Sequence, residues 1–272
     1  MNSLADSFGT YGAGSLAPCE RAAQRVDRVV TLALAIVLLL IGGVAAYSLW
    51  DQFQVLEGTD VSQYKPGLGF GELLKKNPDV CAWIKVDGTR IDYPIVRGKD
   101  DFEYLEKDVE GKFSASGSLF LDSACSRNFD EPYEVVYGHH MDADKMFGDL
   151  DKFLSKKFFN SHKSATLYLP SQTLQLEVVG VIQADAYDGT IFSTPANAER
   201  RQEVEDRLKR DAKFLREDSL GKGSPAADGS GATGEGQIIA LSTCADVGAN
   251  TRTIVMCRVV SRKAEDNSKV GK

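Results

Sequence analysis

The chain has few of the residues that build metal, phosphate or nucleic-acid sites. Only three of its 272 residues are histidine, and its five cysteines stand apart from one another, at positions 19, 81, 125, 244 and 257. None of them has the close spacing of a zinc site, and no glycine-rich phosphate loop joins a strand to a helix. The net charge of -7 leaves no basic face for nucleic acid. The composition therefore predicts no metal, no cofactor and no nucleic-acid partner.

One long apolar run is present near the N-terminus. Residues 29–50 carry no charge, and a helix of this length spans a hydrocarbon core of about 30 Å. Arginines precede the run and acidic residues follow it, so the positive-inside rule predicts residues 1–28 in the cytoplasm and the later chain outside the cell. A cleaved signal peptide is the alternative, because residues 44–46 resemble a cleavage site. We expect an uncleaved single-pass anchor, since the run exceeds a signal core of roughly 7–15 residues.

The rest of the chain shows many short strands and few helices. Residues 51–66 are predicted to form a stalk, residues 67–262 a globular domain and residues 263–272 a polar tail. Strands are predicted at residues 80–86, 90–96, 116–122, 133–139, 164–170, 173–187, 237–243 and 251–260. Helices are predicted at 71–79, 144–159 and 196–217, and the Gly/Ser-rich segment 219–236 as a flexible loop without strands. This pattern indicates a mainly β fold, a barrel with inserted helices.

Two strand ends carry residues that packing does not require. YGHHM (137–141) ends a strand of buried type with two of the three histidines, and ALSTC (240–244) ends another with a thiol, followed at a short distance by Arg252. Strand ends that open into loops display functional groups on a rigid scaffold. A thiol and a distant histidine brought together by folding are a candidate nucleophile and its acid/base partner.

Each residue type suits one role in thiol chemistry. Attack requires the thiolate, which a nearby imidazole favours before it protonates the leaving amine. Arg252 keeps its charge and offers a planar fork of donors that can hold backbone carbonyls or a developing oxyanion. Ser242 and Thr243 can add hydroxyl hydrogen bonds. Taken singly, each has a structural alternative: a buried strand thiol, as expected for Cys81 and Cys257, a histidine capping a strand, or a surface cation.

Together, these residues resemble the sortases. The matching motifs are YGHHM followed by MFGDL (146–150), LSTC (241–244) and an arginine that opens a strand as RTIV (252–255). Residues 77–105 and the helix before the cysteine strand are similar to the class B branch. The resemblance covers roughly residues 67–260, and its motifs are specific only as a set.

The resemblance implies a sortase-type barrel of about eight strands, with N-terminal helices and a long surface helix before the cysteine strand. It also implies a membrane-anchored enzyme that cleaves a C-terminal sorting motif after threonine. The acyl group of the surface protein or pilin then passes to an amine of peptidoglycan or to a pilin lysine. Class B members favour motifs of the Asn-Pro-x-Thr kind.

Matching residue by residue implies catalytic roles for His139, the histidine directly after glycine, and for Cys244 and Arg252. By the same match, the sorting peptide is expected to contact Ser242, Thr243, Leu105 and Ile191. Asp246, two residues after the cysteine, invites a Cys-His-Asp triad. We expect it to be an ordinary loop residue instead, because the family uses arginine.

Three other functions compete with this interpretation. A cysteine hydrolase would use the same thiol and imidazole with water as acceptor. An L,D-transpeptidase fits less well, since its cysteine follows a Ser-His-Gly-type motif, whereas Cys244 follows Leu-Ser-Thr. A non-catalytic surface scaffold would need neither a histidine at a strand end nor an arginine near the thiol.

Overall fold

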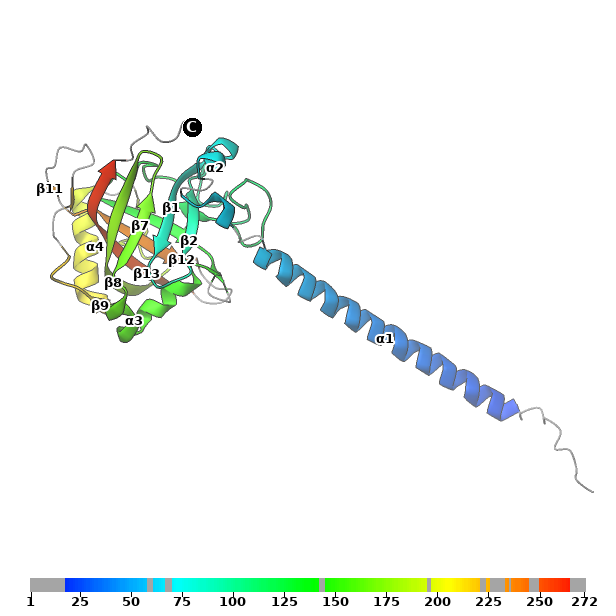
Figure 1. The fold of residues 1–272 in the computed structure, drawn as a ribbon. Coiled ribbons are helices and arrows are strands. Elements are labelled where there is room, and N and C mark those ends of the chain that lie inside the picture. Colours follow the sequence, from blue (N-terminus) through cyan, green and yellow to red (C-terminus); the bar gives the residue numbers. More distant parts are fainter. Residues whose placement is uncertain are drawn as a thin grey trace, which may run out of the picture. The chain divides into compact units, whose positions relative to one another are not determined.

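The computed structural model describes residues 18–57, 61–66, 70–141, 145–194, 197–220, 224–225, 233–234, 236–244 and 250–264. The chain divides into two compact units, Met1–Gln54 and Val55–Lys272. Helix α1 (Pro18–Glu57) makes up the described part of the first unit and enters the second (Figure 1).

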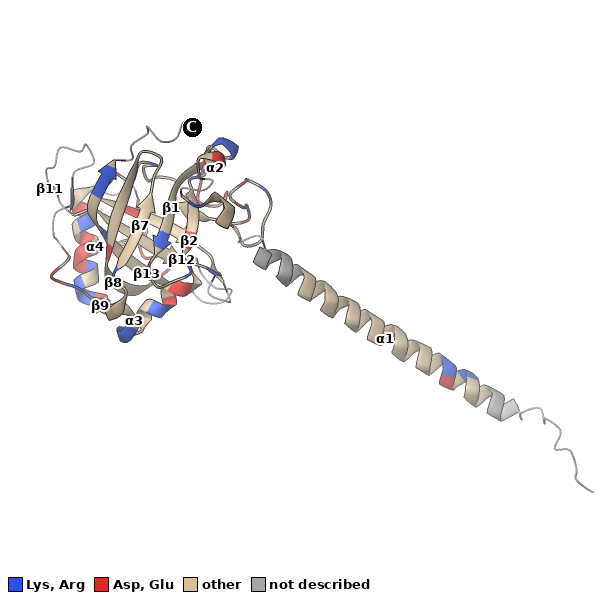
Figure 2. Ribbon diagram, viewed as in Figure 1, with Lys and Arg blue, Asp and Glu red and all other residues tan. Residues whose placement is uncertain are grey.

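Helix α1 is long and apolar enough to cross a membrane over Ala22–Trp50. Within Ala22–Trp50 the charged side chains lie at the beginning, and the following turns up to Trp50 carry none (Figure 2). Leu39 is 75% exposed, and no residue of this stretch is buried by the protein. The predicted helix is therefore present over the apolar run, and its place in a membrane stays a prediction.

Eight strands of the second unit close into a barrel. They are β1 (Val80–Val86), β2 (Asp92–Val96), β3 (Leu119–Leu121), β4 (Tyr133–Gly138), β7 (Ser164–Tyr168), β8 (Gln172–Asp185), β12 (Ile238–Thr243) and β13 (Thr251–Ala264). Their order around the barrel is β13-β12-β4-β3-β2-β1-β7-β8, and β8 pairs back with β13 (Figure 1). The predicted barrel is confirmed. Only the neighbours β2 and β3, and β4 and β12, run parallel.

Strands on one side of the barrel are buried on both faces. In β12, Leu241 belongs to the main core inside the barrel, whereas the preceding residue, Ala240, belongs to a second apolar cluster. Val204 and Leu208 of helix α4 (Ala198–Asp211) join this second cluster. The helix therefore covers the outer face of the wall, which explains why β12 reads as a continuous apolar run.

Two helix predictions need correction. Residues 144–159 do not form one helix: β6 (Lys145–Met146) pairs with β5 (His140–Met141), and helices η3 (Gly148–Leu154) and α3 (Lys156–Ser161) follow. The apolar residues there are buried by two short helices instead of one long helix. The left-handed backbone of Met146 (φ 50°) prevents a helix from continuing through this residue.

The helix predicted over 196–217 ends at Asp211. Leu215, which lies within the predicted helix range, belongs instead to β9 (Phe214–Leu215) and pairs with Gly180. Pairing with the edge of β8 therefore overrides the helical pattern.

Two short segments also differ from the sequence pattern. Val61 and Tyr64, in the predicted stalk, are buried in the main core beside helices η1 (Ser62–Tyr64) and α2 (Phe70–Lys76). In the segment predicted to lack strands, β10 (Ser224–Pro225) pairs with β11 (Thr233–Gly234), so that prediction is wrong at these residues. Most of residues 219–236 lie outside the described residues.

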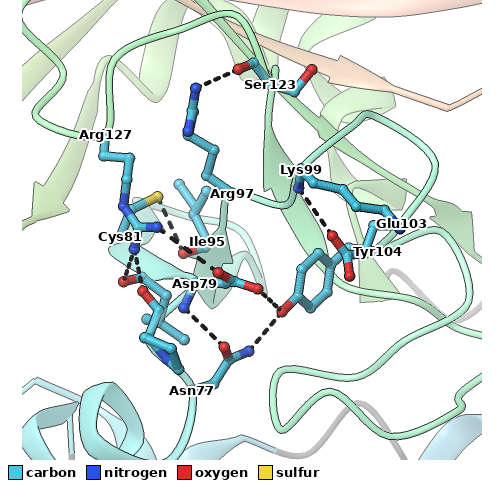
Figure 3. Close-up of polar contacts among 12 residues, drawn as sticks. Asn77, Asp79, Cys81, Ile95, Arg97, Lys99, Glu103, Tyr104, Ser123 and Arg127 are labelled. Atoms are coloured by element: carbon cyan, nitrogen blue, oxygen red, sulfur yellow. Dashed lines mark hydrogen bonds and ion pairs between the residues drawn. The ribbon is translucent and has the colours of Figure 1, made fainter.

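A buried polar network holds the long connection between β2 and β3. Asn77, after α2, donates to the Tyr104 hydroxyl (2.9 Å) and to the Val109 carbonyl (3.0 Å). Tyr104 in turn donates to Asp79 (2.8 Å), as Figure 3 shows. Because these groups are buried or half-buried, the bonds fix the backbone of residues 104–109 against the barrel.

A carboxyl group is buried in β4 at the end of the strand opposite His139. Glu134 is fully buried; one of its oxygens accepts from Gln237 (2.9 Å), and the other finds no donor among the described residues. Burial, reinforced by the nearby charge of Glu131, raises the pKa of Glu134 well above its ordinary value. The folded state therefore holds the protonated form, while the unfolded chain ionises.

We expect Glu134→Gln to raise the free energy of unfolding by about 1–2 kcal/mol near neutral pH. Because the folded pKa is raised, the wild-type protein loses stability as pH rises above the unfolded value of about 4.5. The stabilisation by glutamine should therefore grow between pH 4.5 and pH 8 in thermal unfolding. The exposed Glu199→Gln is the control, and an equal gain at pH 4.5 and 8 would contradict the assignment.

Candidate active site

The parallel pairing of β4 with β12 brings the two predicted strand ends together. Gly138 pairs with Thr243 in this ladder. His139 and Cys244 directly follow these two residues, so they lie at the same end of the two strands. The backbone N–H of Cys244 donates to the Gly138 carbonyl over 2.7 Å. Residues 105 positions apart in the sequence are thereby neighbours.

Arg252 reaches the same place from the other neighbour of β12. Strand β13 runs antiparallel to β12 with Ser242 opposite Ile254, and continuing this register places Arg252 opposite Cys244. The Arg252 guanidinium donates to the Thr243 carbonyl over 3.2 Å. The structure therefore gathers all three predicted residues at the ends of three adjacent strands.

The contact made by His139 defines its tautomer. Its Nε2 lies 2.8 Å from the carbonyl oxygen of Leu105. A carbonyl can only accept, so Nε2 carries the proton and Nδ1 is the nitrogen left to exchange one. The second histidine, His140, instead pairs with Asp151 at 2.9 Å. This distinction agrees with the choice of His139.

Gly117 makes room for the contact between His139 and Leu105. Its backbone is left-handed (φ 56°), and an added Cβ would lie 2.4 Å from the Leu105 carbonyl oxygen and 2.9 Å from the His139 ring. Neither the backbone oxygen nor the ring can move without breaking their hydrogen bond. The glycine thus keeps the histidine in place.

We expect Gly117→Ala to lower turnover by about 100-fold, because displacing a reacting group by about 1 Å has effects of that size. Stability should fall by about 1–3 kcal/mol. Peptide cleavage and thermal unfolding measure the two effects. Gly71→Ala, with no described atom near the added carbon, is the matched control, and wild-type turnover in Gly117→Ala would contradict this role.

Cys244 differs from the other described cysteines. Cys81, Cys125 and Cys257 are buried, whereas Cys244 is partly exposed. The expectation that Cys81 and Cys257 are buried strand thiols is confirmed. Partial burial raises the pKa of the Cys244 thiol, and the charge and hydrogen bond of Arg252 oppose that rise. The arginine is therefore placed to stabilise the thiolate form.

The guanidinium of Arg252 retains an unused donor. Its Nε is buried and has no partner among the described residues, while the group lies 5.6 Å from the centre of the Phe192 ring. An unpaired buried donor beside the thiol can donate a hydrogen bond to a substrate carbonyl. Phe192 was not predicted from the sequence; its place directly after Ile191 was the available signal.

The segment that carries Phe192 is tied to the barrel. The Tyr133 hydroxyl donates to the Ile191 carbonyl over 2.8 Å, and the Thr194 hydroxyl donates to the buried Asp122 over 2.5 Å. Tyr137 stacks against Phe192 with ring centres 6.1 Å apart. The aromatic wall beside Arg252 is therefore fixed rather than an adaptable loop.

The four predicted peptide-contacting residues fall into two groups. Leu105 is partly exposed next to His139. Ser242, Thr243 and Ile191 are buried, and the Thr243 hydroxyl accepts from the backbone of Thr253. Sheet pairing and the second apolar cluster cover the side chains of these three residues, and their contact with the sorting peptide stays a prediction. Asp246 lies outside the described residues.

The described residues hold no group of three or more histidine, cysteine, aspartate or glutamate side chains able to bind a metal. The site can carry out nucleophilic chemistry with the groups present: a thiol, an imidazole that can exchange a proton through Nδ1, and a guanidinium with a free donor.

Comparison with known proteins gives one consistent family. No family model matches the chain. The chain is 27% identical to Staphylococcus aureus sortase B over 214 residues, covering 78% of this chain and 82% of that protein. It is also similar to the crystal structure of a Streptococcus pyogenes class B sortase involved in pilus biogenesis, with 38% identity, a TM-score of 0.62 and coverage of 72% of this chain and 100% of the other.

A further solved structure, sortase B of Clostridium perfringens, is 33% identical with a TM-score of 0.59 and covers 70% of this chain and 99% of that chain. The eight-stranded barrel, the thiol at the end of β12 and these likenesses lead to the same conclusion. The chain belongs to the class B sortases and is a sortase-type cysteine transpeptidase.

Proposed function

We propose that Cys244 attacks the peptide bond after threonine in a C-terminal sorting motif of the Asn-Pro-x-Thr kind. The Cys244 thiol gives its proton to Nδ1 of His139, and the thiolate bonds to the threonine carbonyl carbon. The peptide C–N bond then breaks, and the leaving amine takes that proton from His139. Arg252 holds the substrate carbonyl and its developing negative charge. The observation that carries this proposal is the strand register that places these three groups at adjacent strand ends.

The thioester is then resolved by an amine. The amine nitrogen bonds to the acyl carbon, its proton passes to His139, and the carbon–sulfur bond breaks to return the Cys244 thiolate. Leu105 borders the sorting peptide, while Ser242, Thr243 and Ile191 support the groove from beneath. The acceptor is an amine of peptidoglycan or of a pilin lysine. The second option is supported by the likeness to the S. pyogenes enzyme involved in pilus biogenesis.

The enzyme is anchored in the cell membrane by residues 29–50, with residues 1–28 in the cytoplasm and the catalytic domain, residues 67–262, outside. The apolar helix α1 supports the anchor. The arginines before the apolar run support the orientation.

The full chain in detergent micelles provides the test. A quenched fluorescent peptide containing Asn-Pro-Gln-Thr is incubated with and without an amine, and the products are identified by mass spectrometry. Thiol-dependent cleavage that is diverted to an amide product supports the proposal. Cleavage that stays hydrolytic at every amine concentration would favour the hydrolase, and no reaction with any sorting-type peptide would favour the scaffold.

A further inference from the structure

Two exposed aromatic rings flank one pocket near His139. Among the described residues after α1, the most exposed large apolar side chains are Phe102, Phe113 and Tyr187, at 78%, 80% and 85%. The first two line a pocket of about 360 Å³ together with Leu105 and Glu106. Exposed apolar side chains gathered around a pocket mark a binding surface rather than a packing need.

The pocket is built on an ordered segment. Lys107 and Phe113 form an isolated antiparallel bridge, and the Ser118 hydroxyl donates to the Lys107 carbonyl over 2.8 Å. Tyr104, next to the lining residues, is held by the network of Figure 3. A pocket whose backbone is fixed in this way binds without a large ordering cost.

The position of the pocket favours one of the two substrates. Leu105 lines it and accepts from His139 through its carbonyl. Arg252 lies on the other side of Cys244, because β12 stands between β13 and β4. The acyl carbonyl belongs on the guanidinium side, and the attacking amine belongs beside the imidazole that takes its proton. The pocket therefore lies on the acceptor side.

The charge of the pocket fits a cation. Glu103 is paired with Lys107 at 3.0 Å. Glu106 is exposed, and its carboxylate has no partner among the described residues. The pocket lining thus combines one uncompensated negative charge with two phenyl rings. A lysine side chain offers the complementary charge, and an apolar neighbour in the same peptide fits between the rings.

We propose that this pocket, bounded by Phe102, Glu106 and Phe113, docks a protein acceptor whose nucleophilic lysine lies next to an apolar side chain. The inference rests on the proposed function. Glu106 attracts the lysine as its ammonium form, which loses one proton to solvent to become the neutral amine. The amine nitrogen then bonds to the acyl carbon of the thioester and gives a second proton to His139, while the carbon–sulfur bond breaks and releases the Cys244 thiolate. The apolar neighbour occupies the space between the rings.

The first test measures how the thioester divides between hydrolysis and amide formation with an acceptor. The full chain in detergent receives the sorting-type peptide and one of three acceptors: Nα-acetyl-Phe-Lys-amide, Nα-acetyl-Gly-Lys-amide or triglycine. In Phe102→Ala and Phe113→Ala, we expect about tenfold less amide formation with the Phe-Lys acceptor, which corresponds to about 1.4 kcal/mol. Consumption of the sorting peptide without acceptor should not change, nor should amide formation with triglycine.

The charge is tested separately. Glu106→Gln should lower amide formation with both lysyl acceptors about threefold at low salt, and the difference should vanish at high salt because the attraction is screened. Glu199→Gln, an exposed carboxylate of α4, is the matched control. An equal loss in both variants, or a loss independent of salt, would overturn the role of Glu106.

A binding measurement needs no turnover. Saturation-transfer NMR with the Phe-Lys acceptor should show transfer to its ring and methylene protons, reduced in Phe113→Ala and weaker for the Nε-acetylated peptide. The proposal would be overturned if neither the saturation transfer nor the division of the thioester between hydrolysis and amide formation changed in any pocket variant. Slower consumption of the sorting peptide with an unchanged partition would assign the pocket to the sorting signal, and an equal loss with triglycine would assign it to a wall acceptor. No cleavage at all, with normal transfer, would refute only the proposed function.

Discussion

Replacing Cys244 by alanine is expected to lower cleavage of a sorting-type peptide by about 10⁴-fold or more, as the loss of a covalent nucleophile does in other enzymes. No other described thiol can substitute, since Cys81, Cys125 and Cys257 are buried. Cleavage and trapping of the thioester by mass spectrometry measure the loss. Thermal unfolding should change little, because the side chain is only partly buried and the strand ends at Thr243.

The same prediction extends to His139. Alanine at this position should cost nearly as much as loss of the thiol, and the double variant should be no slower than Cys244→Ala alone, because residues that act as one unit are not additive. His140→Ala, whose imidazole pairs with Asp151, is the control and should retain most activity. Independent, additive losses at residues 139 and 244 would contradict a joint role.

The sequence predicted strands better than it predicted what lies between them. Strand β1 was predicted with its observed bounds, because VCAWIKV has clear strand character and hairpin residues follow it. The ends of β4 and β12 were also located, and with them the candidate residues. Their parallel pairing could not be predicted, since no local pattern specifies the partner of a strand a hundred residues away.

The errors arose where tertiary contacts override local preference. Residues 144–159 have helical spacing, but pairing of β5 with β6 divides them into shorter elements. The burial of Ile191 was likewise not predictable, because the residues of β4 and β12 that belong to the same apolar cluster are distant in sequence. Phe192, Gly117 and the pocket beside Leu105 emerged only from the folded arrangement.

Replacing Arg252 separates the effect of its charge from that of its shape. We expect Arg252→Gln to lower turnover by about 10²–10³-fold, the cost of removing one donor from a developing oxyanion. Its charge also opposes the burial that raises the pKa of the Cys244 thiol. The glutamine variant should therefore show a higher thiol pKa, measured as the pH dependence of Cys244 alkylation followed by mass spectrometry.

Arg252→Lys provides the matched comparison. Lysine keeps the positive charge, so the thiol pKa should remain nearer to that of the wild-type enzyme. It lacks the planar fork, so it cannot donate to the Thr243 carbonyl and to a substrate carbonyl together from the position beside Phe192. Turnover should stay at least tenfold below wild type.

Wild-type turnover in the lysine variant would show that charge alone suffices, whereas an unchanged thiol pKa in the glutamine variant would remove the electrostatic role. The unpaired Nε of Arg252 is the donor available to substrate. If the lysine variant keeps the wild-type thiol pKa but turns over slowly, the guanidinium acts by donating a hydrogen bond to the substrate carbonyl.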